Sequence, residues 1–358
     1  MKGVINIKMR ENKENTRVIY TDLLRILSIC AIILLHVASK NMWAYSVEDR
    51  NFKIYTIYSC MTRWGVPIFF MISGSFLLQP EKNITRNKIS AYCKRLLVAY
   101  IIWSCIYAIW NTVMEKGFSL NALDIGMLKL VIDGPYHFWF MFVMLGLYIV
   151  TPYLRKLVAT SSKDELRNLL CIWAFFSIVV PVLKTYNFDG NLVNLIERTK
   201  MIYCTGYFGY YFLGYYMSKY EVWKRQSVGV YLLFLMSMVL TVSFTFQIES
   251  LNGMRDDFWQ GNFSPTVVLT AMTLFSIFKN LEDYLNRIFN EKMKHRIVIL
   301  ANASFGVYLI HDLFITLLWK LQIDTMRFNP VLSVPMISII IIALSFPICV
   351  GWQLLRIK

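Results

Sequence analysis

Charge is scarce in this chain. Only 16% of its 358 residues are charged and 57% are hydrophobic, whereas about 25% are charged in ordinary soluble domains. Acidic residues are the scarcest, since 22 Asp and Glu stand against 37 Lys and Arg, which gives a net charge of +15. A soluble protein of this length needs a largely polar surface. The composition therefore disfavours a soluble enzyme and a disordered chain, and it predicts an integral membrane protein.

Paired cysteines, repeats and alternating strands are also missing. None of the seven cysteines forms a Cys-x-x-Cys pair, and all lie in or beside long apolar runs. The sequence therefore predicts neither a disulfide framework nor a metal site. No repeat or low-complexity linker marks a second domain, and no series of alternating ten-residue segments indicates a membrane β-barrel.

The chain instead contains a series of long apolar runs. A helix needs about 20 residues to cross the hydrocarbon core of a bilayer. We predict an all-α integral membrane protein, a bundle of about ten transmembrane helices, in which residues 1–17 form a cytoplasmic tail and 18–358 a single transmembrane domain. The ten predicted spans are 18–39, 54–78, 92–114, 136–154, 169–183, 201–218, 228–247, 266–278, 297–319 and 331–355.

The basic residues indicate an orientation. Of the 37 Lys and Arg, 24 lie in segments that a cytoplasmic N-terminus would place inside the cell, and 11 lie in segments outside it. Because Lys and Arg favour cytoplasmic loops, we predict that both termini are cytoplasmic. The basic residues are spread over six short loops rather than one soluble face, which disfavours nucleic acid as a partner. Arg25 and Arg63 remain inside predicted spans.

The first predicted span contains Asp22, Arg25 and His36. Ionisable side chains inside a membrane are costly and are functional candidates by default. Asp22 and Arg25 are three residues apart, so a simple ion pair at the start of the helix stays open. Arg25 and His36 are eleven residues apart, which returns to the same helix face about 16 Å further along the axis. We predict that both side chains face one cavity.

The second predicted span contains Arg63, and Pro67 after it predicts a break in the helix. Counting about 1.5 Å per residue from each span's midpoint puts Arg63, His36 and His311 in the outer half of the membrane. Ser73, next to Gly74, is explained as well by close helix packing as by chemistry.

The fourth and ninth predicted spans add further candidates. His137 and Trp139 open the fourth span, where interfacial aromatic residues are an equally simple interpretation. Tyr308 and His311 lie in the ninth span, where His311 alone would be explained by burial with a hydrogen-bond partner.

Five blocks of sequence occur in a familiar order: Arg25 and His36 separated by ten residues, then 66–74, 94–97, 137–140 and 306–311. Together they resemble the acyltransferase-3 family of bacterial membrane acyltransferases, over nearly the whole chain. The chain is similar to the short members that lack an extracellular esterase-like domain, such as the enterobacterial common antigen O-acetyltransferase. It departs from the family in its basic cluster after the second span, of which only Lys94-Arg95 stays together.

The resemblance implies a multi-pass protein of the bacterial cytoplasmic (inner) membrane. Such a protein transfers an acyl group, usually acetyl, from cytoplasmic acyl-CoA to a hydroxyl of a cell-surface or lipid-linked glycan. The expected partners are therefore acyl-CoA, most simply acetyl-CoA, the glycan acceptor and membrane lipid, and no metal is expected.

We interpret His36 as the general base and Arg63 as the group that meets the charge on the thioester oxygen. Arginine suits phosphate through its fork of donors, so Arg25, with Lys94 and Arg95, is expected to hold the CoA phosphates. The remaining predicted substrate-pocket residues are Asp22, Ser73, His137, Trp139, Tyr308 and His311.

Two other classes of function stay open at this point. A transporter or flippase for an amino acid or a lipid-linked sugar also uses intramembrane charges, although it is more often built from internal repeats. A sensor or assembly protein without catalysis would make the alignment of Arg25 and His36 accidental. The sequence leaves open the acceptor, the oligomeric state, and whether transfer is direct or passes through a covalent acyl-enzyme.

Overall fold

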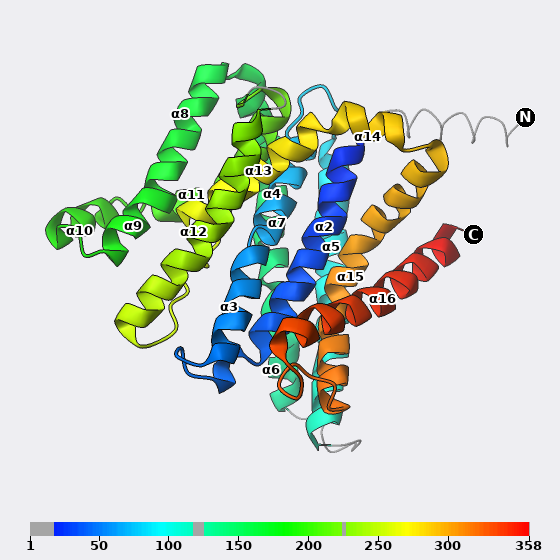
Figure 1. The fold of residues 1–358 in the computed structure, drawn as a ribbon. Coiled ribbons are helices and arrows are strands. Elements are labelled where there is room, and N and C mark those ends of the chain that lie inside the picture. The colour runs from blue at the N-terminus through cyan, green and yellow to red at the C-terminus, as the bar shows by residue number, and fades with distance from the viewer. Residues whose placement is uncertain (1–17, 117–124, 224–226, 358) are drawn as a thin grey trace, which may run out of the picture.

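The computed structural model describes residues 18–116, 125–223 and 227–357, and all regular structure in these ranges is helical (Figure 1). The all-α class is therefore confirmed for this part of the chain, and the predicted tail 1–17 lies outside it. The principal helices are α2 (Ile19–Lys40), α3 (Arg50–Thr62), α4 (Gly65–Leu77), α5 (Arg86–Lys116), α6 (Ile125–Asp133), α7 (Trp139–Thr160), α8 (Lys163–Ala174), α9 (Val180–Thr185), α10 (Gly190–Arg198), α11 (Ile202–Lys219), α12 (Val228–Asn252), α13 (Pro265–Asn280), α14 (Glu282–Ile288), α15 (Glu291–Lys320) and α16 (Pro330–Ile357).

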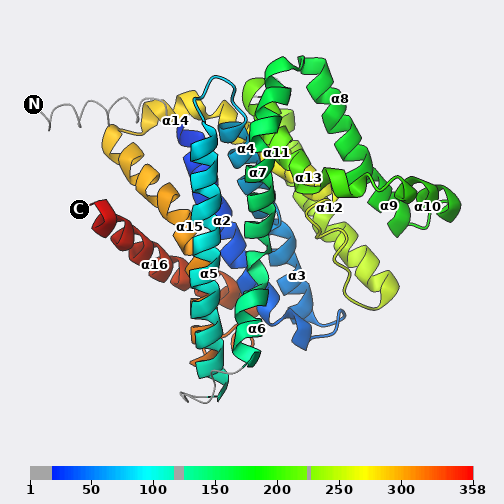
Figure 2. The same cartoon turned by 180° about the vertical axis from the view of Figure 1, so that it is seen from behind.

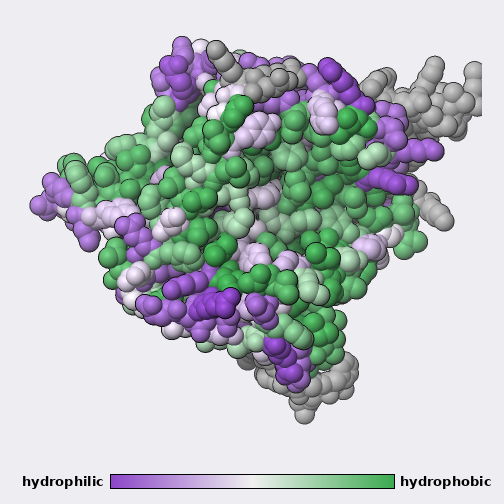
Figure 3. Space-filling view, in the orientation of Figure 1, coloured by the Kyte–Doolittle hydropathy of each residue, from purple (hydrophilic) through white to green (hydrophobic). Residues whose placement is uncertain are grey.

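Eight segments of the described chain are long and apolar enough to cross a membrane. Figure 3 agrees with a membrane protein, because apolar side chains cover the middle of the face shown and polar side chains gather along its upper and lower edges. Each of the ten predicted spans coincides with helix, but α11 and α13 are not among the eight. Helix α13 has only 16 residues, and α11 contains the non-helical Gly206. The count of ten and the orientation of the termini stay predictions.

The second predicted span is two helices. Helix α3 ends at Thr62, α4 begins at Gly65, and Pro67 is the third residue of α4. The first N–H groups of a helix have no partner within it, so a proline is tolerated there. The break therefore lies just before Pro67, and it places Arg63 at the junction between the two helices.

The fifth predicted span begins six residues too late, because α8 begins at Lys163 rather than at 169. Ser162 and Glu165 form a capping box, in which the backbone N–H of each residue donates to the side chain of the other, at 2.7 and 3.2 Å. The Ser-x-x-Glu spacing is a sequence signal for the start of a helix, and it marks the start of α8. The helix then passes through a single wide turn, 175–179, into α9.

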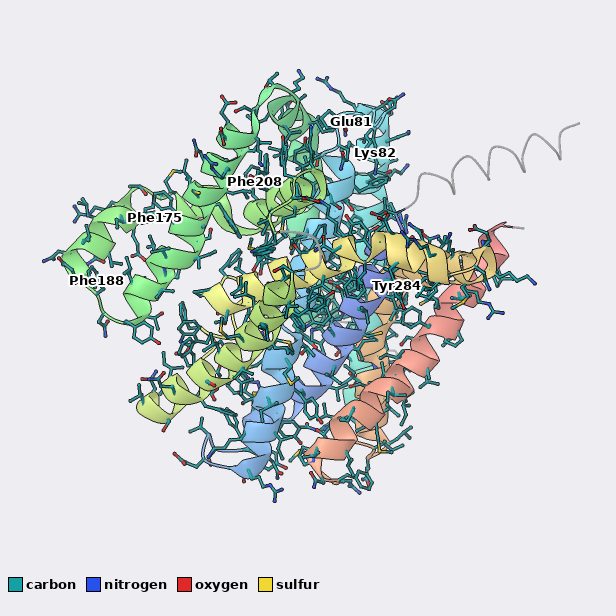
Figure 4. The ribbon with its side chains drawn as sticks, turned by 45° about the horizontal axis from the view of Figure 1, so that its top comes forward. Glu81, Lys82, Phe175, Phe188, Phe208 and Tyr284 are labelled. Carbon is teal, nitrogen blue, oxygen red and sulfur yellow. The ribbon has the colours of Figure 1, made fainter. Side chains whose placement is uncertain are left out.

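Helix α2 lies in the middle of the bundle, where it packs against α3, α4, α15 and α16 (Figures 1 and 2). Helices α8, α9 and α10 project on the side opposite α15 and α16. Phe175 and Phe188 lie on this arm, and both are exposed (Figure 4). The arm therefore offers apolar surface, whereas the surroundings of α2 are enclosed.

Helices α4 and α11 approach each other backbone to backbone. A Cβ atom added to Gly74 would clash with the backbone of Tyr211, and one added to Gly214 would clash with the backbone of Met71. Only glycine allows this separation, as in other membrane helix pairs with small residues at the crossing. Gly74 is thus explained by helix packing, and the crossing fixes α4 beside the neighbouring cavity.

Candidate active site

One cavity of about 350 Å³ runs along α2, within the range of about 300–1,000 Å³ that is typical of small-molecule pockets. Helices α4, α5, α7 and α15 and the short 3₁₀ turn η3 (Tyr136–Phe138) complete its wall. Its lining residues are Arg25, Ile32, His36, Val66, Phe69, Ser73, Phe76, Leu77, Tyr92, Arg95, Leu96, His137, Trp139, Phe140, Met144, Tyr148, Ala301, Asn302, Ser304, Phe305 and Tyr308. Arg25 and His36 face the same cavity, as their eleven-residue spacing predicts.

One end of the cavity, the arginine end, is cationic. Arg25 of α2 and Arg95 of α5 line it, and the positive charges of both interact with the nearby Tyr148. The Arg95 guanidinium lies 5.6 Å from the ring centre of Phe305, close enough for a cation–π contact. No Asp or Glu is among the lining residues in the described chain. This end is therefore suited to an anion, and arginine favours phosphate oxygens.

A loop beside the arginine end is held by one side chain. The Arg155 guanidinium of α7 donates to the backbone oxygens of Leu77, Gln79, Pro80 and Lys82, at 2.6 to 3.4 Å. Figure 4 shows the tip of this loop, with Glu81 and Lys82 labelled. The loop continues directly from Leu77, which lines the cavity, so Arg155 fixes the chain at the cavity's edge.

The other end, the histidine end, joins His36 to His311. His311 Nδ1 lies 2.7 Å from the backbone oxygen of Tyr308, and because a carbonyl only accepts, Nδ1 carries the proton. Neutral His311 then has its lone pair on Nε2, which lies 2.8 Å from Nδ1 of His36. Nδ1 of His36 therefore donates, and Nε2 of His36 keeps a lone pair. The two hydrogen bonds select one tautomer of each ring.

The position of His311 suits this orienting contact. Its side chain is fully buried, whereas His36 lines the cavity. The two rings are nearly parallel, with centres 5.0 Å apart and planes at 24°. The sequence predicted that the two histidines lie in the same half of the membrane, and their contact agrees with a similar height along α2 and α15. The hydrogen bond between them was not predictable, because it depends on how α2 and α15 are rotated against each other.

His137 is the third histidine at this end. Its ring centre lies 5.0 Å from that of His311 and 6.0 Å from that of His36. It lines the cavity, is 2% exposed, and neither ring nitrogen has a hydrogen-bond partner among the described residues. A buried donor without a partner costs about 1–3 kcal/mol. Three of the chain's four histidines thus meet here.

Two tyrosines connect η3 to α15. The Tyr308 hydroxyl donates to the backbone oxygen of His137 at 2.6 Å. The Tyr136 hydroxyl donates to Asp312 Oδ1 at 3.3 Å, and the Tyr136 ring lies 5.4 Å from that of His36. Tyr136 and Asp312 were not predicted as site residues. Their positions beside His137 and His311 in the sequence were the available signal.

Arg63 points elsewhere. Its Nη2 donates to Ser59 Oγ at 3.1 Å and to Gln260 Oε1 at 2.9 Å. Its positive charge is near enough to interact with His36, but Arg63 is not among the cavity's lining residues in the described chain. Gln260 belongs to the loop before α13 and is fully buried. The structure thus separates Arg63 from the wall that carries His36.

The other predicted site residues divide in two. Ser73, Trp139 and Tyr308 line the cavity, and the Ser73 hydroxyl also donates to the backbone oxygen of Phe69 at 2.8 Å. Asp22, buried in the first turn of α2, and Lys94, exposed on α5, are not among the lining residues of the described chain.

The cavity combines two chemistries. Its arginine end can bind an anionic group, and its histidine end presents a neutral imidazole with a defined lone pair, which can take a proton from an alcohol. Within the ranges that the structure describes, no group of three or more His, Cys, Asp or Glu side chains could hold a metal ion.

Comparison with known proteins gives one result. The model of the acyltransferase-3 family, described as an acyltransferase domain, matches residues 18–350. No curated protein and no solved structure matches the chain.

Proposed function

Because the chain belongs to the acyltransferase-3 family, which makes it a membrane acyltransferase in general terms, we propose a specific reaction. The protein transfers an acyl group, acetyl in the first instance, from cytoplasmic acyl-CoA to a hydroxyl of a cell-surface or lipid-linked glycan. It does so from the cytoplasmic membrane of a bacterium, with both termini inside the cell. The observation that supports this most is the single cavity that Arg25 and His36 both line.

The donor binds at the arginine end. Arg25 and Arg95 contact the CoA phosphates through paired N–H donors, and Lys94 adds charge from the exposed side of α5. The pantetheine arm extends along α2 and carries the thioester to the histidine end. Residues eleven apart on one helix are separated by about 16 Å, which the extended arm spans.

The transfer step begins at Nε2 of His36. This atom takes the proton of the acceptor hydroxyl while the hydroxyl oxygen attacks the thioester carbonyl carbon. The tetrahedral intermediate then collapses, the carbon–sulfur bond breaks, and the CoA thiolate receives the proton from the imidazolium. The products are an O-acyl ester and CoA with a free thiol, and His36 returns to its neutral form.

His311 acts as a positioning residue in this step. It accepts from Nδ1–H of His36, so the proton from the acceptor can enter only at Nε2, on the cavity side. When His36 is briefly charged, the same hydrogen bond strengthens, because a charged donor forms the stronger bond. Arg63 lies near His36 but away from the cavity wall. It therefore contributes only through the long-range electrostatic effect of its positive charge.

The test is mass spectrometry of cell-surface glycans from cells with and without the protein. The proposal expects a species heavier by one acyl group only when the protein is present, and its loss with His36→Ala at matched protein level. The control is His295→Ala, which removes an exposed histidine on α15 and leaves the product intact. Identical glycans with and without the protein would reject acyl transfer to a surface glycan and favour a transporter.

A further inference from the structure

The reaction needs one group that the preceding steps do not supply. As the acceptor attacks, negative charge develops on the thioester oxygen, and an enzyme stabilises it with a donor placed in advance. Arg63 donates to Ser59 and Gln260 and is not on the cavity wall. His36 and His311 are already used as base and positioning residue. The donor must therefore come from the remaining polar groups at the histidine end.

His137 is a buried polar side chain at this end whose hydrogen-bonding capacity is unused. It lines the cavity, is 2% exposed, and has no partner at either ring nitrogen among the described residues. A neutral imidazole carries one N–H donor. In a native protein, a buried donor without a partner calls for an explanation, and a missing ligand is one.

The groups around His137 hold its ring in place without using that donor. The rings of Phe138, Tyr107 and Tyr308 lie 4.7, 5.5 and 5.5 Å from it. Each nearby tyrosine hydroxyl donates elsewhere: that of Tyr107 to the backbone oxygen of Leu309, and that of Tyr308 to the backbone oxygen of His137 itself. The ring is thus fixed by packing, and its backbone by a hydrogen bond.

The distance to the base suits one reacting carbon. The ring centres of His36 and His137 are 6.0 Å apart. A tetrahedral carbon between them can present its attacking oxygen to one ring and its carbonyl oxygen to the other, each over a hydrogen bond of about 2.8 Å.

We infer that His137 is a further catalytic residue, whose neutral imidazole donates a hydrogen bond to the thioester carbonyl oxygen and holds the oxyanion of the tetrahedral intermediate. His137 keeps its proton throughout, and the negative charge returns from oxygen when the carbon–sulfur bond breaks. Neutral imidazole serves as such a donor in other enzymes. This inference rests on the proposed acyl transfer.

The test compares His137→Phe with His137→Asn in purified full-length protein, with acetyl-CoA and an acceptor that wild type acetylates. Phe keeps a ring but no donor, and Asn keeps an N–H donor in a smaller side chain. We expect kcat to fall about 10²–10³-fold with Phe, KM for acetyl-CoA to stay near the wild-type value, and Asn to recover at least about tenfold in kcat over Phe. Equal acetyl-CoA affinity in both variants, and an unchanged unfolding temperature, show that each protein is folded.

The outcomes separate the inference from the proposed function. Wild-type kcat in His137→Phe would overturn the inference alone, and so would an effect on KM without any on kcat. A loss in His137→Asn as large as in His137→Phe would also overturn it, because a donor would then not be what is required. A wild-type protein that binds acetyl-CoA but transfers nothing to any hydroxyl would reject the proposed function itself.

Discussion

The two ends of the cavity differ in how their side chains are held. At the arginine end, Arg95 is exposed and lines the cavity, and its neighbour Lys94 is exposed but is not among the lining residues of the described chain. At the histidine end, His311 and His137 are buried, and His36 is fixed through His311 to a backbone oxygen of α15. One end holds charge on long side chains that are only partly buried, and the other holds imidazoles in fixed positions.

This difference follows from what each end has to do. Binding phosphate needs positive charge and N–H donors, and the attraction between opposite charges falls off only gradually with distance. Proton transfer needs a heavy-atom distance within hydrogen-bond reach and the correct tautomer. Substitutions at the histidine end should therefore change kcat, and substitutions at the arginine end should change KM for acyl-CoA.

The largest effect is expected at His36. His36→Ala removes the proton acceptor, so kcat should fall about 10²–10⁴-fold, the usual contribution of a general base, while KM for acetyl-CoA stays unchanged. The measurement is the rate of acetyl transfer by purified protein, with His295→Ala as the control. A variant that kept more than a tenth of the wild-type kcat would remove His36 from the mechanism.

A smaller loss is expected at His311, because it acts through His36. His311→Phe should lower kcat about 10- to 100-fold, as is found for groups that orient metal-bound histidines. Nitrogen NMR of histidine-labelled protein gives the structural readout, since the chain has only four histidines. Wild type should show His36 protonated at Nδ1 only, and the variant a mixture of tautomers. A single, unchanged tautomer in the variant would argue against a positioning role.

At the arginine end, Arg25→Ala should raise KM for acetyl-CoA about 10- to 100-fold, because a hydrogen bond to a charged group contributes about 1.5–3 kcal/mol, and it should leave kcat near the wild-type value. Added salt should weaken acetyl-CoA binding to wild type more than to the variant, because fewer charge contacts remain to be screened. A fall in kcat with unchanged KM would place Arg25 in the chemical step.

The smallest expected effect is that of Lys94→Ala on KM for acetyl-CoA, compared with that of Arg95→Ala. Arg95 lines the cavity and Lys94 does not. Lys94→Ala should change KM for acetyl-CoA by less than about fivefold, because an exposed charge away from the cavity wall contributes about 0–1 kcal/mol. Arg95→Ala removes a guanidinium from the wall itself and should resemble Arg25→Ala. If the lysine variant were the weaker binder of the two, the CoA phosphates would lie on the outer side of α5.

The sequence was most informative where one helix decides the outcome. The shared face of Arg25 and His36 follows from helical periodicity within α2. Arg63 was predicted to lie in the same half of the membrane as His36, but depth does not fix the rotation of a side chain about the helix axis. The break before α4 directs Arg63 toward Gln260. His137 belongs to a short 3₁₀ turn without its own periodicity, and its neighbours come from α2, α5 and α15, so its place could not be read from its own segment.

The central claim is that one cavity joins an end that binds acyl-CoA to an end that performs the chemistry. The most direct test is calorimetric titration of acetyl-CoA into purified His36→Ala and Arg25→Ala. The account predicts wild-type affinity for His36→Ala, although its turnover is largely lost, and about 10- to 100-fold weaker binding for Arg25→Ala. Wild-type affinity in Arg25→Ala together with weakened binding in His36→Ala would contradict it.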